Sequence, residues 1–166
     1  LRATETAEAL KRALEHLDHA GLSHSRIAEP MRANLITAYV ASRIPVDEAI
    51  PLVRGVGVRE AGVLASAWER IVLGRLHAMR GEFELARELV RGGRQAYVDA
   101  GLLVSAGGIS MSEAKVEARA GDPAAAERAL REGLEILGGV GERGYYPTVA
   151  LNLADLLYDQ GHYDEL

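Results

Sequence analysis

The sequence contains no cysteine, and only 5% of its residues are aromatic. Without cysteine the chain can form no disulfide, no thiolate nucleophile and no cysteine-ligated zinc or iron–sulfur site. The scarcity of aromatic residues disfavours β-sheets, in which aromatic and β-branched residues are enriched. Alanine, leucine, glutamate and arginine dominate instead, and all four have high helix propensity. The composition therefore predicts an all-α fold.

An excess of positive charge and long apolar runs are also absent. The formal net charge is -5 at pH 7, which argues against direct binding of nucleic acid, because phosphate neutralisation requires a basic face. No apolar run approaches the ~20 residues that a membrane span needs. Apolar residues still make up 48% of the 166 residues, which is enough for a core. We therefore expect a folded cytoplasmic protein that does not bind a membrane.

A short pattern that opens with glycine recurs along the chain. It occupies residues 81–86, 121–126 and 161–166, and residues 44–49 and 4–9 match it less closely. In chain order, the last residues of successive copies are separated by 40, 37, 40 and 40 positions. A register kept over five copies identifies an internal repeat of about 40 residues.

Each copy of the pattern fits a turn between two helices. Glycine closes a helix readily because it adopts left-handed backbone angles. Asp122-Pro123 then combines an N-cap residue with proline at the first helical position. The small residue five positions after the glycine, as at Ala86, allows two helices to approach closely. A second glycine series falls about half a period away and should join one hairpin to the next: Gly21, Gly62, Gly101 and Gly141.

Between the turns, apolar residues recur at steps of three and four, as in amphipathic helices. The period predicts helices over 5–20, 24–43, 46–54, 60–80, 82–100, 103–120, 122–139 and 146–160. Residues 54–59 break the pattern and should form a longer inter-repeat loop. Short turns make consecutive helices antiparallel. We therefore predict a single domain over 1–166, an antiparallel helical-hairpin solenoid whose second helices start near residues 4, 44, 81, 121 and 161.

The residues around the turn at Gly81 resemble the tetratricopeptide repeat (TPR). Leu73-Gly74 lies seven positions before the turn, and the aromatic Phe83 and the small Ala86 follow it. The resemblance implies a TPR-like superhelix, although a period of about 40 residues exceeds the usual 34.

Two other units match this pattern only in part. Leu153-Ala154 and Tyr163 take the corresponding places in the last unit. The unit in between departs further, with Glu113-Ala114 and Pro123 in those places. The repeat is therefore degenerate, and the residue types at its motif positions vary from unit to unit.

The last third of the chain carries a closer likeness. Residues 120–134, 141–145 and 158–165 resemble the C-terminal helical arrays of large bacterial regulators, in which such an array follows a class III adenylate cyclase and an NTPase module. Related arrays occur in LuxR-type and SARP-type transcription activators. The likeness implies a parent architecture, and it places no cyclase or nucleotide-binding residue in this chain.

Glycine and histidine residues give no convincing cofactor or metal motif. The glycines between residues 55 and 62 lack both the spacing and the preceding strand of a dinucleotide-binding turn. His16 and His19 share a helix face close to His24, but no carboxylate pattern typical of a zinc helix accompanies them. His77 is expected on a helix face. We therefore predict neither a cofactor site nor a metal site.

Serine and aspartate residues likewise give no convincing catalytic motif. Ser105, Ser110 and Ser112 lie in a small-residue helix without a nucleophile-elbow motif or a nearby histidine. Asp155 and Asp159 lie one helical turn apart, and we interpret them as solvated residues or as contacts for a partner's cation. We therefore expect no catalytic residue in this chain.

One surface remains as a candidate for function. In a TPR-like solenoid the first helix of each hairpin lines the concave face, which can hold a peptide or a partner helix. Counting back from the turn glycines predicts these lining residues: Trp68, Ile71, Arg75, Met79, Met111, Lys115, Arg119, Leu151, Asp155, Tyr158 and Asp159. The basic strip of Arg75, Lys115 and Arg119 would grade into an acidic end. In the alternative interpretation, Trp68, Ile71 and Leu151 belong to the core and the charges are solvated.

These observations favour a non-catalytic interaction or sensor module of a larger cytoplasmic signalling regulator, linked to a cyclase or an NTPase. Its partner would be a protein, a peptide segment or a neighbouring domain of the same chain. The TPR-like region of a transcription activator and a rigid spacer are the alternatives. We also expect the array to be truncated at both ends, with exposed apolar edges that allow self-association.

Overall fold

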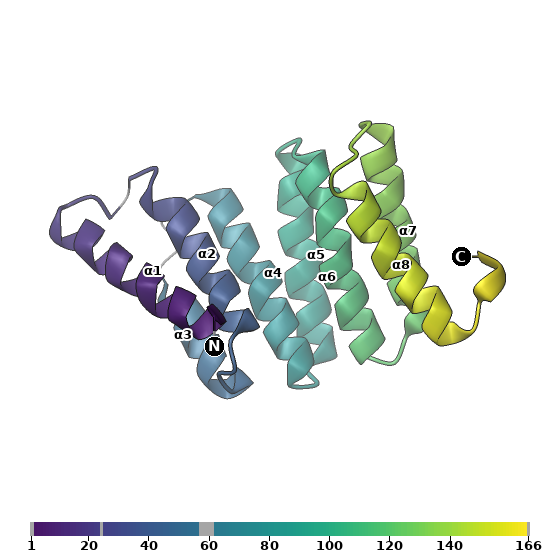
Figure 1. Cartoon of the computed structure of the whole chain (residues 1–166), viewed down its shortest axis with the longest axis horizontal. Coiled ribbons are helices and arrows are strands. Elements are labelled where there is room, and N and C mark those ends of the chain that lie inside the picture. The colour runs from purple at the N-terminus through teal and green to yellow at the C-terminus, as the bar shows by residue number, and fades with distance from the viewer. Residues whose placement is uncertain (1, 24, 57–61, 166) are drawn as a thin grey trace.

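The computed structural model describes residues 2–23, 25–56 and 62–165. In these residues it contains eight α-helices, a short 3₁₀ helix and no strand, which confirms the all-α prediction. In chain order (Figure 1) they are α1 (Arg2–His19), α2 (Ala28–Ala41), α3 (Val46–Gly55), α4 (Val63–Met79), α5 (Phe83–Asp99), α6 (Leu103–Arg119), α7 (Pro123–Gly139), α8 (Tyr146–Gln160) and η2 (Tyr163–Glu165).

Helix bounds depart from the sequence prediction mainly in the first half of the chain. Helix α2 begins at Ala28 instead of residue 24, and the Ala28 N–H donates to the carbonyl of Ser25 at 3.0 Å and to its Oγ at 3.3 Å. Helix α3 continues to Gly55, so Arg54 and Gly55 are helical and do not belong to the expected loop. The rest of that loop, residues 57–59, lies outside the described residues.

Among the described residues, seven glycines have positive φ angles, and they comprise both series that the sequence marked. They are Gly21, Gly62, Gly81, Gly101, Gly121, Gly141 and Gly161, with φ between 68° and 106°. At the end of α4 the Gly81 N–H donates to the Ala78 carbonyl at 3.1 Å, and the Glu82 N–H donates to the His77 carbonyl at 3.0 Å. These bonds satisfy carbonyls that the helix end leaves open. The predicted turns are thereby confirmed.

The acidic residues that precede α5 and α7 have different contacts. Asp122 caps α7 as predicted, since its Oδ1 accepts a hydrogen bond from the Ala125 N–H at 2.8 Å, and Pro123 opens the helix. Glu82 occupies the corresponding N-cap position before α5. Its carboxylate does not cap that helix but contacts Nδ1 of His77, and it pairs with Arg80 at 3.3 Å.

Glycines set the spacing inside the hairpins. A Cβ added to Gly93 would lie 2.5 Å from Cγ1 of Ile71 and 2.8 Å from the Ala67 carbonyl, so α4 and α5 are in backbone contact there. The equivalent residue 40 positions later, Gly133, would bring its Cβ within 2.8 Å of the Gly107 carbonyl, between α6 and α7. These two crossings fix the helix pairs as close-packed antiparallel hairpins.

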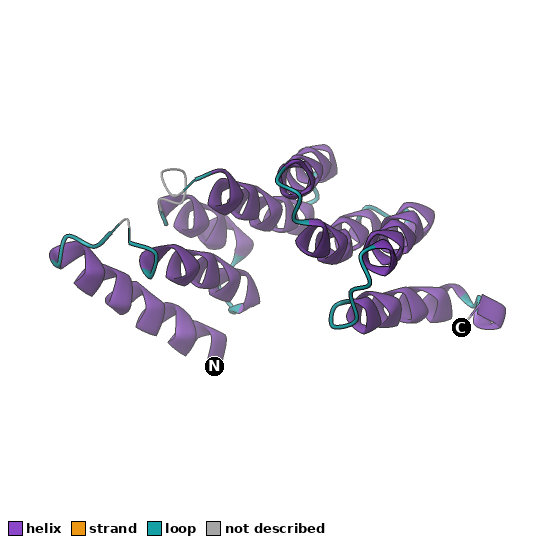
Figure 2. Cartoon of the chain, turned by 90° about the horizontal axis from the view of Figure 1, so that it is seen from above, coloured by secondary structure: helices purple, strands orange, loops and turns teal. Residues whose placement is uncertain are grey.

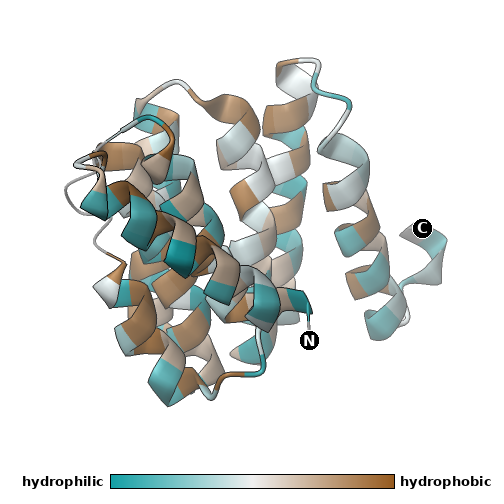
Figure 3. Cartoon of the chain, turned by 60° about the vertical axis from the view of Figure 1, so that its left-hand side comes forward, coloured by the Kyte–Doolittle hydropathy of each residue, from teal (hydrophilic) through white to brown (hydrophobic). Residues whose placement is uncertain are grey.

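The hydrophobic core is a series of three clusters rather than one centre. The first joins α1 to α4, the second α4 to α6, and the third α6 to α8. Their largest fully buried side chains include Ile36, Ile71, Leu130 and Leu137. Figure 3 shows hydrophobic and hydrophilic residues interspersed along the helices. Each cluster holds only adjacent elements, which is the construction of a solenoid.

Seen from above, the helices form an arch (Figure 2). Helices α2, α4, α6 and α8 follow its inner side, whereas α3, α5 and α7 lie behind them on the outer side. The first helix of each hairpin therefore lines the concave face, as the sequence predicts. The fold is a helical-hairpin repeat solenoid.

Candidate functional site

Two pockets lie next to each other on the inner face. The first, which we call the basic pocket, measures about 230 Å³ and is lined by Val40 of α2, by Arg75, Ala78 and Met79 of α4, and by Lys115, Val116 and Arg119 of α6. The second, the aromatic pocket, measures about 260 Å³, and its walls include Trp68, Tyr97, Met111 and Tyr145. Arg75 and Lys115 line both pockets, so the two are neighbours, and together we call them the inner groove.

The basic pocket brings three positively charged side chains together. Burial and the charge of Arg119 lower the pKa of Arg75. Burial lowers the pKa of Lys115, as do the charges of Arg75 and Arg119. In the described part of the chain, no carboxylate lies within ion-pair distance of these three cations. The pocket therefore holds three cations whose positive charges repel one another.

The aromatic pocket presents ring surfaces to solvent. Nε1 of Trp68 donates to Oγ1 of Thr37 on α2 at 3.3 Å, so the indole is held between two inner helices. Tyr145 also lines this pocket, and it is 52% exposed. A Cβ on Gly108 would lie 3.4 Å from Cδ1 of Tyr145, so glycine keeps the space beside the ring open.

The structure brings together some of the predicted groove residues and separates others. Trp68, Arg75, Lys115 and Arg119 line the inner groove, together with Met79 and Met111. On α8, Asp155, Tyr158 and Asp159 are exposed and line neither pocket, and Tyr158 instead packs edge to face on Tyr163 with ring centroids 5.4 Å apart.

Two of the remaining lining predictions have opposite outcomes. Ile71 is fully buried because it packs against Gly93 at the α4–α5 crossing, so the lining prediction was wrong there and the core interpretation was right. Leu151 is 61% exposed, so the core interpretation was wrong for it.

The sequence analysis did not predict two residues that line the aromatic pocket, Tyr97 and Tyr145. Tyr97 lies on the second helix α5, and Tyr145 lies in the connection before α8. Counting back from the turn glycines samples only the first helices, so neither residue could be found in that way. The sequence offered a signal for Tyr97 in the apolar stripe of α5, but no periodicity places Tyr145.

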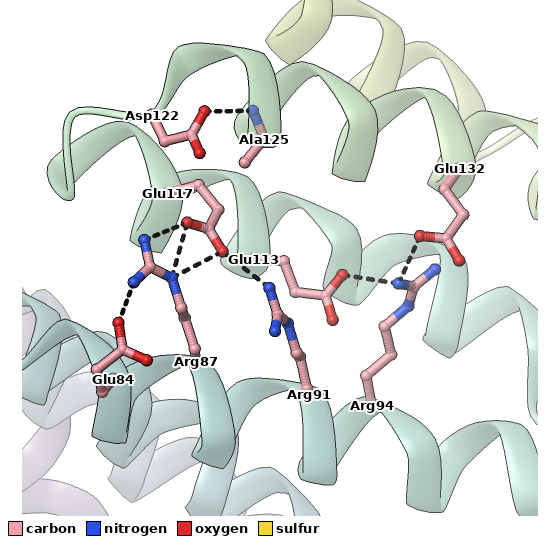
Figure 4. A network of polar contacts seen from close by, with 9 residues as sticks. All are labelled: Glu84, Arg87, Arg91, Arg94, Glu113, Glu117, Asp122, Ala125 and Glu132. Atoms are coloured by element: carbon pink, nitrogen blue, oxygen red, sulfur yellow. Dashed lines mark hydrogen bonds and ion pairs between the residues drawn. The ribbon is translucent and has the colours of Figure 1, made fainter.

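A third hollow, of about 630 Å³, lies between α5, α6 and α7. Figure 4 shows the ion pairs that line it. Glu117 accepts hydrogen bonds from Nη2 of Arg87 at 2.8 Å and from Nη2 of Arg91 at 3.2 Å. Arg94 donates through Nη1 to Glu113 at 2.7 Å and to Glu132 at 3.2 Å.

The buried charges in this hollow satisfy one another. Nε of Arg94 also donates to the Ala106 carbonyl at 3.1 Å, so this buried guanidinium is bound on several sides. Burial raises the pKa of Glu113, although the positive charge of Arg94 opposes that shift. Because each buried charge has a partner, we assign the network a structural role at the interface between hairpins.

The other residues weighed for chemistry lie apart from each other. His77 lies in α4, and its side chain is buried and contacts Glu82. Nδ1 of His19 bonds to the Glu15 carbonyl at 2.8 Å, and His24 lies outside the described residues. In the described ranges, no group of three or more His, Cys, Asp or Glu residues is placed to hold a metal ion.

The repeat motif itself is recognised by comparison with known families. Residues 67–91, 111–132 and 147–165 match the tetratricopeptide repeat family. The chain contains a TPR-like repeat region. The matched segments run from α4 into α5, from α6 into α7 and from α8 into η2. TPR repeats generally bind protein partners and are generally non-catalytic.

Two further findings concern the chain as a whole. A comparison with curated proteins returned no match. Within the ranges that the structure covers, every helix is too short or too polar to cross a membrane.

Proposed function

We propose that the TPR-like region is an interaction or sensor module that binds a partner protein, or a neighbouring domain, in its inner groove. We further propose that the module belongs to a larger cytoplasmic signalling regulator linked to a cyclase or an NTPase. The support for that larger context is the resemblance of residues 120–165 to the helical arrays of such regulators.

One observation carries the proposal of binding: no carboxylate of the described residues pairs with the cations of the inner groove, whereas Arg91 and Arg94 of the outer hollow are paired. Arg87 and Arg94 on the outer side meet glutamates of α6 and α7. Arg75 and Lys115, on the inner side, face each other and Arg119. Like charges held together cost free energy, and a bound anionic partner would relieve that cost.

A partner bound inside the arch would contact several repeats at once. A segment seated in the inner groove touches α2, α4 and α6, which belong to successive repeats. Each repeat of a solenoid contacts only its neighbours, so a ligand that bridges several repeats biases their relative orientation. Partner binding would in this way change the distance and angle between the domains that flank the array.

Site-specific photocrosslinking tests the proposal. A photoreactive phenylalanine analogue replaces Ser112 in the aromatic pocket, and in a matched variant it replaces Glu88, an exposed residue of the outer helix α5. In cells that express the full-length protein, we expect a partner-specific crosslink, or a crosslink to a neighbouring domain, from position 112 and not from position 88. Equal crosslinking from both positions, or none from position 112, would refute the proposed groove and favour a rigid spacer.

A further inference from the structure

We propose that the ligand of the inner groove is an acidic peptide segment that carries a large apolar side chain next to its carboxylates. The apolar side chain would enter the aromatic pocket, and the carboxylates would enter the basic pocket. This inference rests on the proposed function and adds the chemistry of the partner.

The positive charge of the basic pocket is local. The whole chain carries a formal charge of -5, yet Arg75, Lys115 and Arg119 gather at one pocket with Val40, Met79 and other apolar atoms around them. At physiological ionic strength, charges more than roughly 8 Å apart are largely screened. A partner therefore responds to the three nearby cations rather than to the distant negative surface. Carboxylates are the anionic groups of an unmodified protein partner, and they match guanidinium geometry.

The aromatic pocket selects an apolar side chain. The indole N–H of Trp68 is already bonded to Thr37, so the pocket offers ring faces and the Met111 side chain rather than free polar groups. Aromatic residues and methionine are typical anchors of protein interfaces, because they bury a large area with few rotatable bonds. The hydroxyls of Ser105 and Ser112 lie at the wall and do not change this preference.

The shared residues connect the two pockets into one recognition unit. Arg75 and Lys115 line both, so the anchor and the acidic groups must be neighbours along the partner segment. A nucleic acid would also offer anions and flat rings, but its regularly spaced phosphates require a longer basic track than three residues. The groove therefore fits a short peptide better than a polynucleotide strand.

Selection from a display library of random 12-residue peptides, with the purified 166-residue chain as bait, tests the inference. We expect enriched peptides to contain aspartate or glutamate beside tryptophan, phenylalanine, leucine or methionine. The most enriched peptide is then synthesised with a fluorophore, and its Kd is measured by anisotropy for the native chain and for variants.

Two groove variants and two matched controls make the result specific. Replacing Arg75, Lys115 and Arg119 together with glutamine should weaken binding by at least roughly 30-fold, because charge-assisted contacts are lost. Tyr145→Ala should weaken it by roughly tenfold. The charge control replaces the exposed cations Arg43, Arg128 and Arg143 with glutamine, and the aromatic control is Tyr146→Ala; neither set lines the inner groove. Both controls should change Kd by less than about twofold.

The possible failures separate the two proposals. Enriched peptides that lack acidic or apolar residues, but lose binding in both groove variants, would overturn this inference and leave the proposed function standing. Peptides unaffected by either groove variant, or a selection without enrichment, would overturn both. Phosphoserine at the acidic positions is a further arm: tighter binding by tenfold or more would show that the pocket is built for phosphate and overturn the assignment to carboxylates. Full displacement of the peptide by an equimolar 12-nucleotide RNA would overturn the assignment of the ligand to peptides.

Discussion

The packing of α6 on α7 gives a sharp prediction for Gly133→Ala. The added Cβ would lie 2.1 Å from Oγ of Ser110 and 2.8 Å from the carbonyl oxygen of Gly107. The serine can rotate, but the carbonyl belongs to the backbone of α6 and cannot move without the helix. The two helices must therefore separate along the crossing, and the apolar contacts on either side of it loosen.

The magnitude follows from two opposing terms. Overpacking of a close contact costs up to about 3 kcal/mol, and replacing glycine by alanine inside a helix recovers about 1 kcal/mol. We therefore expect Gly133→Ala to lower the free energy of unfolding by about 2 kcal/mol. For a chain of this size that corresponds to a fall in Tm of about 4–8 °C.

Thermal unfolding followed by circular dichroism at 222 nm measures the effect. Gly139→Ala is the matched control, because it lies in the same helix and no atom comes within 4 Å of its added Cβ. It should leave Tm unchanged or raise it. The double variant Ser110→Gly with Gly133→Ala should recover part of the loss, since the contact with the Gly107 carbonyl remains. If Gly133→Ala were as stable as Gly139→Ala, the argument that backbone contact sets the hairpin spacing would fail.

Three further predictions concern polar groups. Ser110→Ala should be neutral or stabilise the fold by up to about 1 kcal/mol in urea unfolding, because the buried Oγ has no hydrogen-bond partner in the described residues. Arg94→Met should lower the free energy of unfolding by about 3 kcal/mol at pH 8, because it leaves the buried carboxylate of Glu113 without its partner. Burial raises the pKa of Glu113, so the protonated side chain favours the folded state at low pH, and this contribution is lost as the pH rises through that pKa. The cost of Arg94→Met should therefore be smaller at pH 5. Lys115→Met removes repulsion with Arg75, so Tm should not fall even though peptide binding weakens.

Sequence reasoning succeeded where the determinants of structure are local. Gly81 and Gly121 end helices through their own backbone angles, and Asp122 caps a helix through an atom three residues away. Apolar steps of three and four then supply the helices between the turns. Because each hairpin contacts only its neighbours, these local features were enough to predict the order of the layers and the inner position of the first helices.

The same reasoning could not predict contacts made between distant residues. Glu113 departs from the TPR pattern, and the sequence alone gave no reason for a charge at a position where the pattern has leucine. The structure supplies that reason, because Nη1 of Arg94 on α5, 19 residues earlier in the chain, donates a hydrogen bond to the Glu113 carboxylate at 2.7 Å. Tyr145 illustrates the same limit, since only the path of the α7–α8 connection brings it to the aromatic pocket.

Helix α6 shows how the two charged surfaces of the molecule are related. Glu113 and Glu117 lie one helical turn apart and face the outer hollow, where arginines of α5 bind them. Lys115 and Arg119, also one turn apart, are offset by two residues and line the inner groove. Two residues on an α-helix correspond to about 200°, so the acidic and basic pairs point to opposite sides.

The two pairs differ in what surrounds them, and this difference bears on function. Like charges four residues apart destabilise a helix by a few tenths of a kcal/mol. For the acidic pair, the guanidinium groups of Arg87 and Arg94 offset that cost within the fold. For the basic pair, no carboxylate of the described residues does so. Helix α6 therefore has one charged face that is neutralised within the fold and a second that no described carboxylate neutralises. The second face is the one that the proposed ligand would contact.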